Sequence, residues 1–335
     1  MTIPRVVVTQ RFFDDETTAY LRANGCQVDI AESSKVDGDG NLSHDQLVSI
    51  LRDADAWIVG HAQVTRELLE ALPELKIVAR RGVGYERVDV EAARTLGRVV
   101  TIAAGGNDAS VADHALGLML AVGRRLRETQ MNMVAGNWTI LISSDLYRKT
   151  VGLIGLGRIG RNVVQRLKGF EARILVSAPS ADKAYAEANG ITYVDVETLL
   201  RDSDYVSLHA PLSATTRNLI NKDTLALMKP TAVLINTARG GLVEDRDLLE
   251  ALKGGTIAGA GLDVFLSETD PGYRSVSDEL VALPNVVASP HSAASSVEGL
   301  ARTNMVAAQC VIAVLNGRDP PSGCVVADGR GRASR

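Results

Sequence analysis

Short apolar runs rich in β-branched residues alternate with amphipathic segments through the N-terminal part of the chain. The amphipathic segments at residues 43–52 and 88–96 space their apolar residues as a helix does, and Ser43 is placed to cap the first of them. The apolar runs have the length of strands and predict strands at residues 5–8, 27–30, 56–59, 77–79 and 99–101. Because parallel strands need crossover helices, this alternation predicts a small parallel sheet with helices on both faces.

A second set of alternating elements begins near residue 150 and carries a glycine pattern. A β-branched run at residues 150–154 predicts a strand, and an amphipathic run at residues 159–168 predicts a helix. The glycines follow the strand at G-x-G-x-x-G spacing, which permits a tight turn, a close approach of backbone amides to a pyrophosphate, and packing of the helix on the strand. The helix N-terminus then presents free N–H groups to the anion. We therefore predict a dinucleotide site that includes Gly155, Gly157, Arg158, Ile159 and Gly160.

Charged side chains follow the later strands of this set. The strands are predicted at residues 232–236, 259–264 and 286–288, and the charged residues shortly after them are Arg239, Glu268 and His291. The carboxyl ends of parallel strands meet at one edge of the sheet, where ligands bind in open α/β folds. An Arg, a Glu and a His at that edge favour a functional site over scattered surface residues.

Other strand ends also carry candidate residues. Arg80 and Arg81 follow an earlier strand and precede Gly82 and Gly84, whose backbone N–H groups could hold a carboxylate. A tight turn with two solvated arginines is an equally good interpretation from the pattern alone. The strand predicted at residues 205–209 ends at His209, which we expect to position the backbone or the cofactor rather than to catalyse.

Long helical patterns indicate how the domains are connected. The pattern at residues 109–129 predicts a single helix that crosses between domains, and His114 within it is expected to be structural. The amphipathic pattern at residues 297–315 predicts a helix that returns to the first domain. Trp138, in an irregular segment, predicts either an interface or simple packing. The predicted domains are a substrate-binding domain of residues 1–102 and 296–335 and a dinucleotide-binding domain of residues 103–295.

Composition narrows the class of protein. The 335 residues are 46% hydrophobic and 23% charged, as in ordinary globular proteins, and the net charge of −4 gives no reason to expect a nucleic-acid partner. Cys26, Cys310 and Cys324 show neither the spacing of a metal site nor a disulfide framework, so we expect thiols in a reducing cytoplasm and no metal. The first residues are too short and interrupted for a signal peptide, and no apolar run approaches the length of a membrane span.

The motifs together resemble those of the D-isomer-specific 2-hydroxyacid dehydrogenase family. The resemblance implies an α/β fold of two Rossmann-like domains with parallel sheets, in which the nucleotide domain is inserted into a discontinuous substrate domain. It also implies an NAD(P)-dependent enzyme, usually a homodimer, in which Trp138 matches a residue that reaches toward the partner subunit's site in some relatives. The motifs occur in the family's order: Gly82-Val83-Gly84-Tyr85, the glycine turn from Gly155 to Gly160, His209-Ala210-Pro211-Leu212, the turn from Asn236 to Gly240, Leu262-Asp263-Val264-Phe265 and Pro290-His291.

The resemblance implies a role for each candidate. Reduction of a 2-oxo acid needs a hydride at the carbonyl carbon, a proton at its oxygen and a fixed carboxylate. Histidine can carry the proton, glutamate can orient the imidazole and raise its pKa, and arginine offers a planar fork to the carboxylate. The catalytic residues implied are Arg239, Glu268 and His291; the cofactor-binding residues are Gly155, Gly157, Arg158, Ile159, Gly160, Ser177, Ala178, His209, Ala210, Pro211, Thr216, Thr237, Ala238, Asp263 and His291; the substrate-binding residues are Arg81, Val83, Gly84, Arg239 and His291.

Departures from the family pattern bear on the substrate. Relatives that oxidise formate have Gln where Glu268 stands, and relatives that oxidise phosphite have Lys in place of Val83. We therefore expect a small unphosphorylated acid such as glyoxylate, hydroxypyruvate or a simple 2-oxo acid, although Arg80 or Arg81 could hold a second anionic group. The alternatives are a phosphoglycerate-type dehydrogenase, whose common C-terminal regulatory domain we do not expect here, and a dinucleotide-sensing protein like the resembling corepressors.

The end of the second strand of the nucleotide domain bears on the cofactor. An acidic residue at this position accepts hydrogen bonds from the ribose hydroxyls of NAD and repels the 2′-phosphate of NADP. This chain has Ala178 there, next to the small Ser177, so we expect NADP to be accepted in preference to NAD or alongside it. The alternative is that Asp182 replaces the missing acid and NAD remains preferred.

Overall fold

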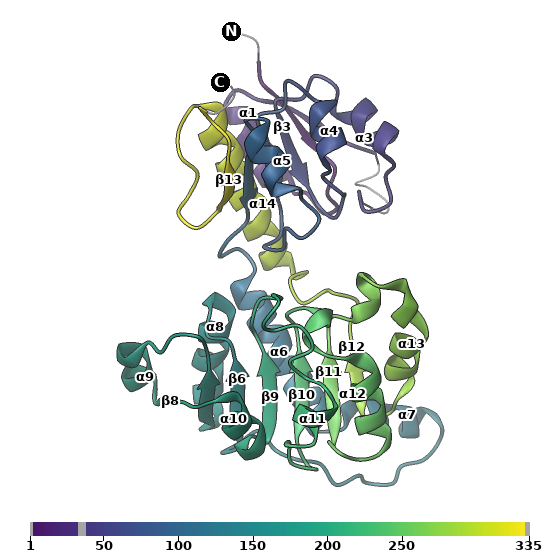
Figure 1. Cartoon of the computed structure of the whole chain (residues 1–335). Coiled ribbons are helices and arrows are strands. Elements are labelled where there is room, and N and C mark those ends of the chain that lie inside the picture. The colour runs from purple at the N-terminus through teal and green to yellow at the C-terminus, as the bar shows by residue number, and fades with distance from the viewer. Residues whose placement is uncertain (1–2, 33–37, 332–335) are drawn as a thin grey trace. The chain divides into compact units, whose positions relative to one another are not determined.

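The computed structural model describes residues 3–32 and 38–331, and the chain forms two compact units (Figure 1). The first unit consists of Met1–Asn107 together with Ser295–Arg335, and the second of Asp108–Ala294. The sequence placed the first division between residues 102 and 103. Residues 103–107 belong to the first unit because Ala103 N–H donates to Gly82 O and a Cβ at Gly106 would lie 2.7 Å from the Thr303 side chain.

The sheet of the first unit has the strand order β13-β5-β4-β3-β1-β2. The pairs are parallel except that β13 runs antiparallel to β5. Buried side chains of α1 (Asp15–Ala23) and α14 (Val297–Leu315) cover one face, and those of α3 (His44–Leu51), α4 (Arg66–Glu70) and α5 (Val90–Thr95) cover the other. The strands are β1 (Arg5–Val8), β2 (Gln27–Ile30), β3 (Ala56–Val59), β4 (Ile77–Arg80), β5 (Val99–Ile102) and β13 (Val325–Asp328).

The sheet of the second unit is entirely parallel, with the order β12-β11-β10-β9-β6-β7-β8. One face is covered by α6 (Asp108–Gly123) and α8 (Arg158–Leu167), and the other by α10 (Val196–Asp202), α11 (Lys222–Leu225), α12 (Asp245–Lys253) and α13 (Arg274–Ala282) (Figure 1). The strands are β6 (Thr150–Ile154), β7 (Arg173–Ser177), β8 (Ile191–Tyr193), β9 (Tyr205–Leu208), β10 (Val233–Asn236), β11 (Gly259–Leu262) and β12 (Val286–Ala288). The predicted α/β class with helices on both faces is confirmed.

The predicted single helix at residues 109–129 is wrong, because the structure has two helices there. The helix α6 ends at Gly123, Arg125 adopts a left-handed φ of +52°, and α7 (Leu126–Val134) begins after it. A Cβ at Gly123 would lie 2.2 Å from the Tyr205 hydroxyl, so the close packing of this residue on the sheet requires glycine. The Gly123 carbonyl accepts the N–H of Ser144 instead of continuing the helix.

The sequence prediction did not include two edge strands, β8 and β13. Both are short and lie at the margin of a sheet, where apolar residues need not fill both faces. In the part of the chain that the structure describes, no helix combines the length and apolar character needed to cross a membrane.

Candidate active site

Backbone crowding fixes the glycine turn that follows β6. Gly155 adopts φ +100°, and a Cβ on it would lie 2.7 Å from backbone atoms of His209 and Ala210. A Cβ on Gly160 would lie 2.6 Å from the Gly155 carbonyl oxygen. Both positions therefore require glycine, and the turn is held against the end of β9.

The N-terminus of α8 is open toward a ligand. Gly157 occupies the N-cap without a side-chain cap, and a Cβ built there would meet nothing within 4 Å. The first N–H groups of this helix of 10 residues are thus available to an anion, which fits the pyrophosphate of a dinucleotide. Arg158 begins the helix with its Nε donating to Asp108 at 2.9 Å, and Ile159 packs its half-buried side chain toward the core.

The segment after β7 carries no free acid at the predicted ribose position. Ser177 and Ala178 are half-buried, and Asp182 caps α9 (Lys183–Asn189) by accepting the Tyr185 N–H at 3.0 Å. Asp182 also forms an ion pair with Arg161 at 2.8 Å, and this hydrogen bond is the largest cause that lowers its pKa. The carboxylate of Asp182 is therefore already bonded within the protein.

Hydrogen bonds hold the loop after β9. His209 Nε2 lies 2.9 Å from Ser207 Oγ, and burial lowers the pKa of His209 to about 4, so the ring is neutral at physiological pH. Thr216 Oγ1 donates to the Pro211 carbonyl at 2.7 Å and accepts the Ser213 N–H at 2.8 Å. Ala210 packs against the core of the second unit. Of these predicted cofactor residues, His209 and Thr216 use their side chains to shape the loop.

Asn236 organises the turn after β10. Its amide donates to the Arg239 carbonyl at 2.9 Å and accepts the Ala238 N–H at 3.0 Å, while Arg239 Nη1 donates to the Ala238 carbonyl at 2.7 Å. Gly240 is essential here because its Cβ would lie 2.2 Å from the Phe265 backbone. Thr237 Oγ1 is buried without a hydrogen-bond partner among the described residues, which suits a cofactor contact.

Glu268 and His291 form the closest ionisable pair of the site. His291 Nδ1 lies 2.6 Å from Glu268 Oε2, and the other Glu268 oxygen accepts the Phe265 N–H at 2.8 Å. Since an ionised carboxylate only accepts, Nδ1 carries the hydrogen and Nε2 is left to exchange a proton with a ligand. These residues lie beyond the carboxyl ends of β11 and β12, as Arg239 does beyond β10.

The pair shifts both pKa values toward the charged forms. The hydrogen bond to Glu268 is the largest cause that raises the pKa of His291; burial opposes it, and the charges of Glu268 and Asp263 add to it. Burial acts most strongly on Glu268 and would raise its pKa. The hydrogen bond and charge of His291, together with the Phe265 N–H and the charge of Arg239, nevertheless lower the pKa of Glu268.

Asp263 is fully buried at the end of β11, with 0% of its surface exposed. Its Oδ1 accepts from Ser289 Oγ at 2.5 Å and from Ser292 N–H at 2.8 Å, and its Oδ2 accepts from Ala293 N–H at 2.9 Å. The Asp263 carbonyl accepts the N–H of His291, whose φ is +51°. The residue predicted to lie near the nicotinamide thus holds the loop that carries His291.

Sequence reasoning missed Asp245, a buried carboxylate behind the pair. Asp245 accepts the N–H of Leu266 at 3.0 Å, in the 3₁₀ turn Leu266–Glu268. Burial is the main cause that raises its pKa to about 6, and the charges of Glu244 and Glu268 add to it. An acid in the first turn of a helix is common, so its sequence position carried no distinguishing signal.

The first unit holds the predicted substrate-binding turn. Arg80 is buried and its Nε donates to the Gly84 carbonyl at 2.8 Å, while burial lowers the pKa of Arg80 to about 10. The interpretation with two solvated arginines is therefore wrong for Arg80. Arg81 and Val83 are half-buried, and burial lowers the pKa of Arg81.

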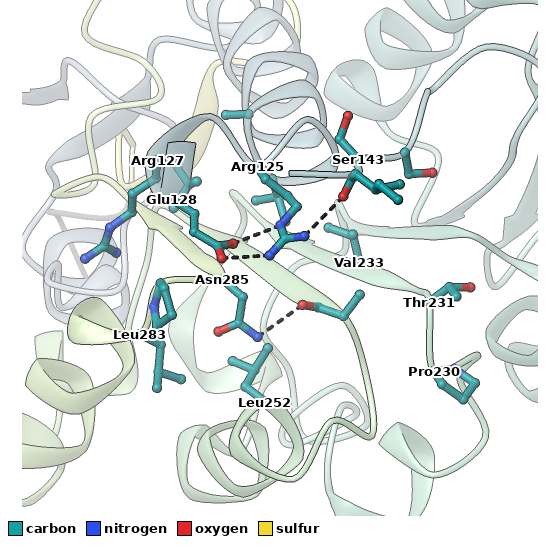
Figure 2. Close-up of a pocket in the computed structure, with 18 of the residues that line it drawn as sticks. Arg125, Arg127, Glu128, Ser143, Pro230, Thr231, Val233, Leu252, Leu283 and Asn285 are labelled. Atoms are coloured by element: carbon teal, nitrogen blue, oxygen red, sulfur yellow. Dashed lines mark hydrogen bonds and ion pairs between the residues drawn. The ribbon is translucent and has the colours of Figure 1, made fainter. Parts of the chain in front are cut away.

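A cavity of about 770 Å³ lies elsewhere in the second unit (Figure 2). Its lining comes from the ends of α6, the start of α7 and the segments that enter β10, β11 and β12 at their amino ends. Arg125 and Glu128 form an ion pair of 2.7 Å at this cavity. Because Arg239, Glu268 and His291 follow the carboxyl ends of the same strands, the cavity is at the opposite edge of the sheet and is not their site. Among the described residues, no group of His, Cys, Asp and Glu side chains could hold a metal ion.

The match to a protein family decides the identity of this arrangement. The model of the NAD binding domain of D-isomer specific 2-hydroxyacid dehydrogenases matches residues 116–293. The chain belongs to this family. It is 39% identical over 284 residues to a glyoxylate reductase of Korarchaeum cryptofilum, covering 83% of this chain and 82% of the reductase. The 2-hydroxyacid dehydrogenase family fold is also present in the TT0316 protein of Thermus thermophilus, which superposes with a TM-score of 0.84 at 34% identity over 96% of this chain and 100% of that one.

A second relative marks the open question within the family. The chain is 37% identical to a D-3-phosphoglycerate dehydrogenase of Methanocaldococcus jannaschii, over 86% of this chain but only 55% of that protein. The predicted membership of the 2-hydroxyacid dehydrogenase family and the two-domain Rossmann fold are confirmed. The chain is a nicotinamide-dependent oxidoreductase of 2-oxo and 2-hydroxy acids.

Proposed function

We propose that this 2-hydroxyacid dehydrogenase reduces a small 2-oxo acid, such as glyoxylate or hydroxypyruvate, to the D-2-hydroxy acid. The observation that carries the proposal is the 2.6 Å pair of His291 and Glu268, which favours a protonated imidazole close to the positive charge of Arg239. A proton donor beside a fixed cation is what a 2-oxo carbonyl and its carboxylate need.

The residues divide the work as follows. The nicotinamide, when bound, supplies the hydride. His291 Nε2 gives a proton to the carbonyl oxygen, and Glu268 stabilises the imidazolium that makes this possible. Arg239 binds the carboxylate and orients the carbonyl, with its backbone fixed by Asn236. Val83 and Gly84 are proposed to donate their backbone N–H groups to the substrate carboxylate, with Arg81 adding positive charge.

The cofactor is proposed to lie along the carboxyl edge of the second unit's sheet. The open N-terminus of α8 would hold the pyrophosphate, with Gly155, Gly157 and Gly160 allowing the approach. The unpartnered hydroxyl of Thr237 and the neutral ring of His209 would line the same edge. Arg158, Ile159, Ala210, Pro211, Thr216, Ala238 and Asp263 complete the proposed cofactor-binding set.

A panel of acids tests the function. Purified protein is mixed with NADH or NADPH and glyoxylate, hydroxypyruvate, pyruvate or 3-phosphohydroxypyruvate, and cofactor oxidation is followed. We expect steady turnover of an unphosphorylated acid. Preference for the phosphorylated acid would instead support the phosphoglycerate-type alternative, and cofactor binding without turnover of any acid would support the dinucleotide-sensing alternative.

We further propose that NADP is accepted alongside or in preference to NAD. Ala178 offers no carboxylate to the ribose hydroxyls, and Asp182 is bonded to Arg161 and to the start of α9. A 2′-phosphate would therefore meet no repelling acid at Ala178.

The variant Ala178→Asp tests this cofactor proposal. The new carboxylate should shift kcat/KM toward NADH and away from NADPH, because each lost or gained hydrogen bond to a charged group contributes about 1.5–3 kcal/mol, or roughly tenfold or more. Ala178→Asn is the matched control without charge and should leave NADPH accepted. Wild-type protein that rejects NADPH by a hundredfold or more would contradict the proposal.

A second copy of this chain is the proposed partner. Trp138, Ile140 and Ile142 are 75%, 91% and 89% exposed in the segment that follows α7, and α7 itself buries no residue. Such a contiguous apolar segment is typical of an obligate interface, and homodimers are usual in the family. We also propose a reducing compartment such as the cytoplasm, which the buried free thiols of Cys26, Cys310 and Cys324 support.

A further inference from the structure

His114 projects from α6 toward residues that surround the proposed catalytic histidine. Its Nε2 lies 2.8 Å from Ser289 Oγ, and that hydroxyl donates to Asp263 Oδ1 at 2.5 Å. A serine hydroxyl has only one proton. Because Ser289 gives it to the carboxylate, its oxygen must accept from His114, so Nε2 of His114 carries a hydrogen.

The chain of hydrogen bonds continues from Asp263 into the loop around His291. The buried carboxylate holds the N–H groups of Ser292 and Ala293, and the Asp263 carbonyl holds that of His291 at 2.7 Å. These bonds maintain the left-handed backbone of His291, a conformation that non-glycine residues adopt only when their surroundings stabilise it.

The position of Asp263 depends on donors from outside its own loop. It is 0% exposed, and His114 Nε2 lies 3.6 Å from its Oδ1 as well as beside Ser289. The imidazole N–H of His114 therefore faces both the hydroxyl and the buried negative charge. Since α6 packs on the sheet with buried residues on both sides of His114, it provides a rigid base for this contact.

We propose that His114 is a positioning residue: through Ser289 and Asp263 it fixes the loop that presents His291 to the substrate. The inference rests on the proposed function, in which His291 is the proton donor. It assigns to His114, which the sequence pattern indicated as structural, a task in aligning the reaction.

Two substitutions in the full chain separate this role from simple packing. His114→Leu keeps a bulky side chain but removes the N–H, whereas His114→Gln keeps an amide N–H that can reach the place of Nε2. A displaced catalytic group of this kind typically costs up to about 100-fold in rate. We expect His114→Leu to lower kcat by roughly 10- to 100-fold with KM changed less than about threefold, and His114→Gln to recover most of the loss.

Amide hydrogen exchange gives a readout that does not depend on turnover. The N–H groups of Ser292 and Ala293 should exchange about tenfold or more faster in His114→Leu than in wild type, since local opening would release them, and should stay protected in His114→Gln. Equal exchange in all three proteins would overturn the inference.

A double-mutant cycle tests the route through Ser289. If His114 acts through this hydroxyl, His114→Leu combined with Ser289→Ala should reduce kcat no further than the more impaired single variant. Fully additive losses would overturn the proposed route. If wild type turned over none of the acids, the proposed function would fail, and the exchange comparison alone would still decide whether His114 holds the loop.

Discussion

His291 holds its backbone at a φ of +51°, and this conformation affects how its role can be tested. Alanine at this position would remove the imidazole and also add backbone strain of about 1–3 kcal/mol. Asparagine tolerates left-handed backbone far better. The contribution of the imidazole is therefore measured more cleanly by His291→Asn than by His291→Ala.

We expect His291→Asn to lower kcat for reduction of the preferred 2-oxo acid by roughly 10²- to 10⁴-fold, the usual range for a lost general acid. Cofactor affinity, measured by fluorescence titration, and the melting temperature should change little. Activity within a few-fold of wild type would show that His291 is not the proton donor.

The carboxylate of Glu268 sets the pH range of the reaction. Reduction needs protonated His291, whose pKa Glu268 raises, so kcat/KM should fall as pH rises through that pKa. In Glu268→Gln this descending limb should move about 1 to 3 pH units lower, as expected for loss of an opposite charge in contact. Glu244→Gln is the matched control, because Glu244 bonds to Tyr273 instead. An unmoved limb in Glu268→Gln would remove Glu268 from this role.

Residue types at strand ends could be predicted, but their mutual contacts could not. The positions of Arg239, Glu268 and His291 followed from the spacing of the strands and from the family motifs. Asn236, Asp245 and the route from His114 to Asp263 depend on which side chains meet in space, and no local pattern marks them.

At the scale of elements, Asp245 links the start of α12 to the 3₁₀ turn that carries Glu268. Its pKa is raised from 3.8 to about 6, so the folded chain binds this proton more tightly than the unfolded chain does. Stability from this group is complete below the unfolded value and is lost as pH rises through about 6. At about 1.36 kcal/mol per pH unit, the buried charge costs about 3 kcal/mol at neutral pH.

Asp245→Asn should therefore increase the free energy of unfolding at pH 8, by up to about 3 kcal/mol, and change it little at pH 4. Urea unfolding followed by circular dichroism at both pH values measures the difference. Glu250→Gln, on the exposed face of α12, is the control and should not reproduce the pH-dependent gain. A gain of the same size at both pH values would contradict the assignment to the buried charge.

The elements themselves were largely predictable because buried parallel strands consist of compact apolar runs. Strands β1, β2, β3, β6 and β12 have the predicted bounds. The break between α6 and α7 was not predictable, since it depends on the packing of Gly123 against Tyr205, which is distant in sequence. The edge strand β13 was missed for a similar reason: its pairing with β5 is antiparallel and joins the two ends of the first unit's sequence.

At the scale of the whole molecule, the exposed segment after α7 predicts the oligomeric state. Wild-type protein should sediment as a dimer at micromolar concentration. Ile140→Ser with Ile142→Ser should weaken the dimer about 100-fold or more, because burying each isoleucine contributes roughly 1.5–3 kcal/mol. Val297→Ser alters another exposed apolar side chain, on α14, and should leave the dimer intact. Monomeric wild-type protein would contradict the prediction.

The second unit is one uninterrupted stretch of chain, Asp108–Ala294, whereas the first is assembled from both ends. A single recombination cassette could therefore carry the glycine turn, Ala178, Arg239, Glu268 and His291 together into another member of the family. The turn that contains Arg81, Val83 and Gly84 would remain with the recipient. Cofactor preference and proton transfer are thus heritable as one block of sequence, and the contacts proposed for the substrate carboxylate can diversify separately from it.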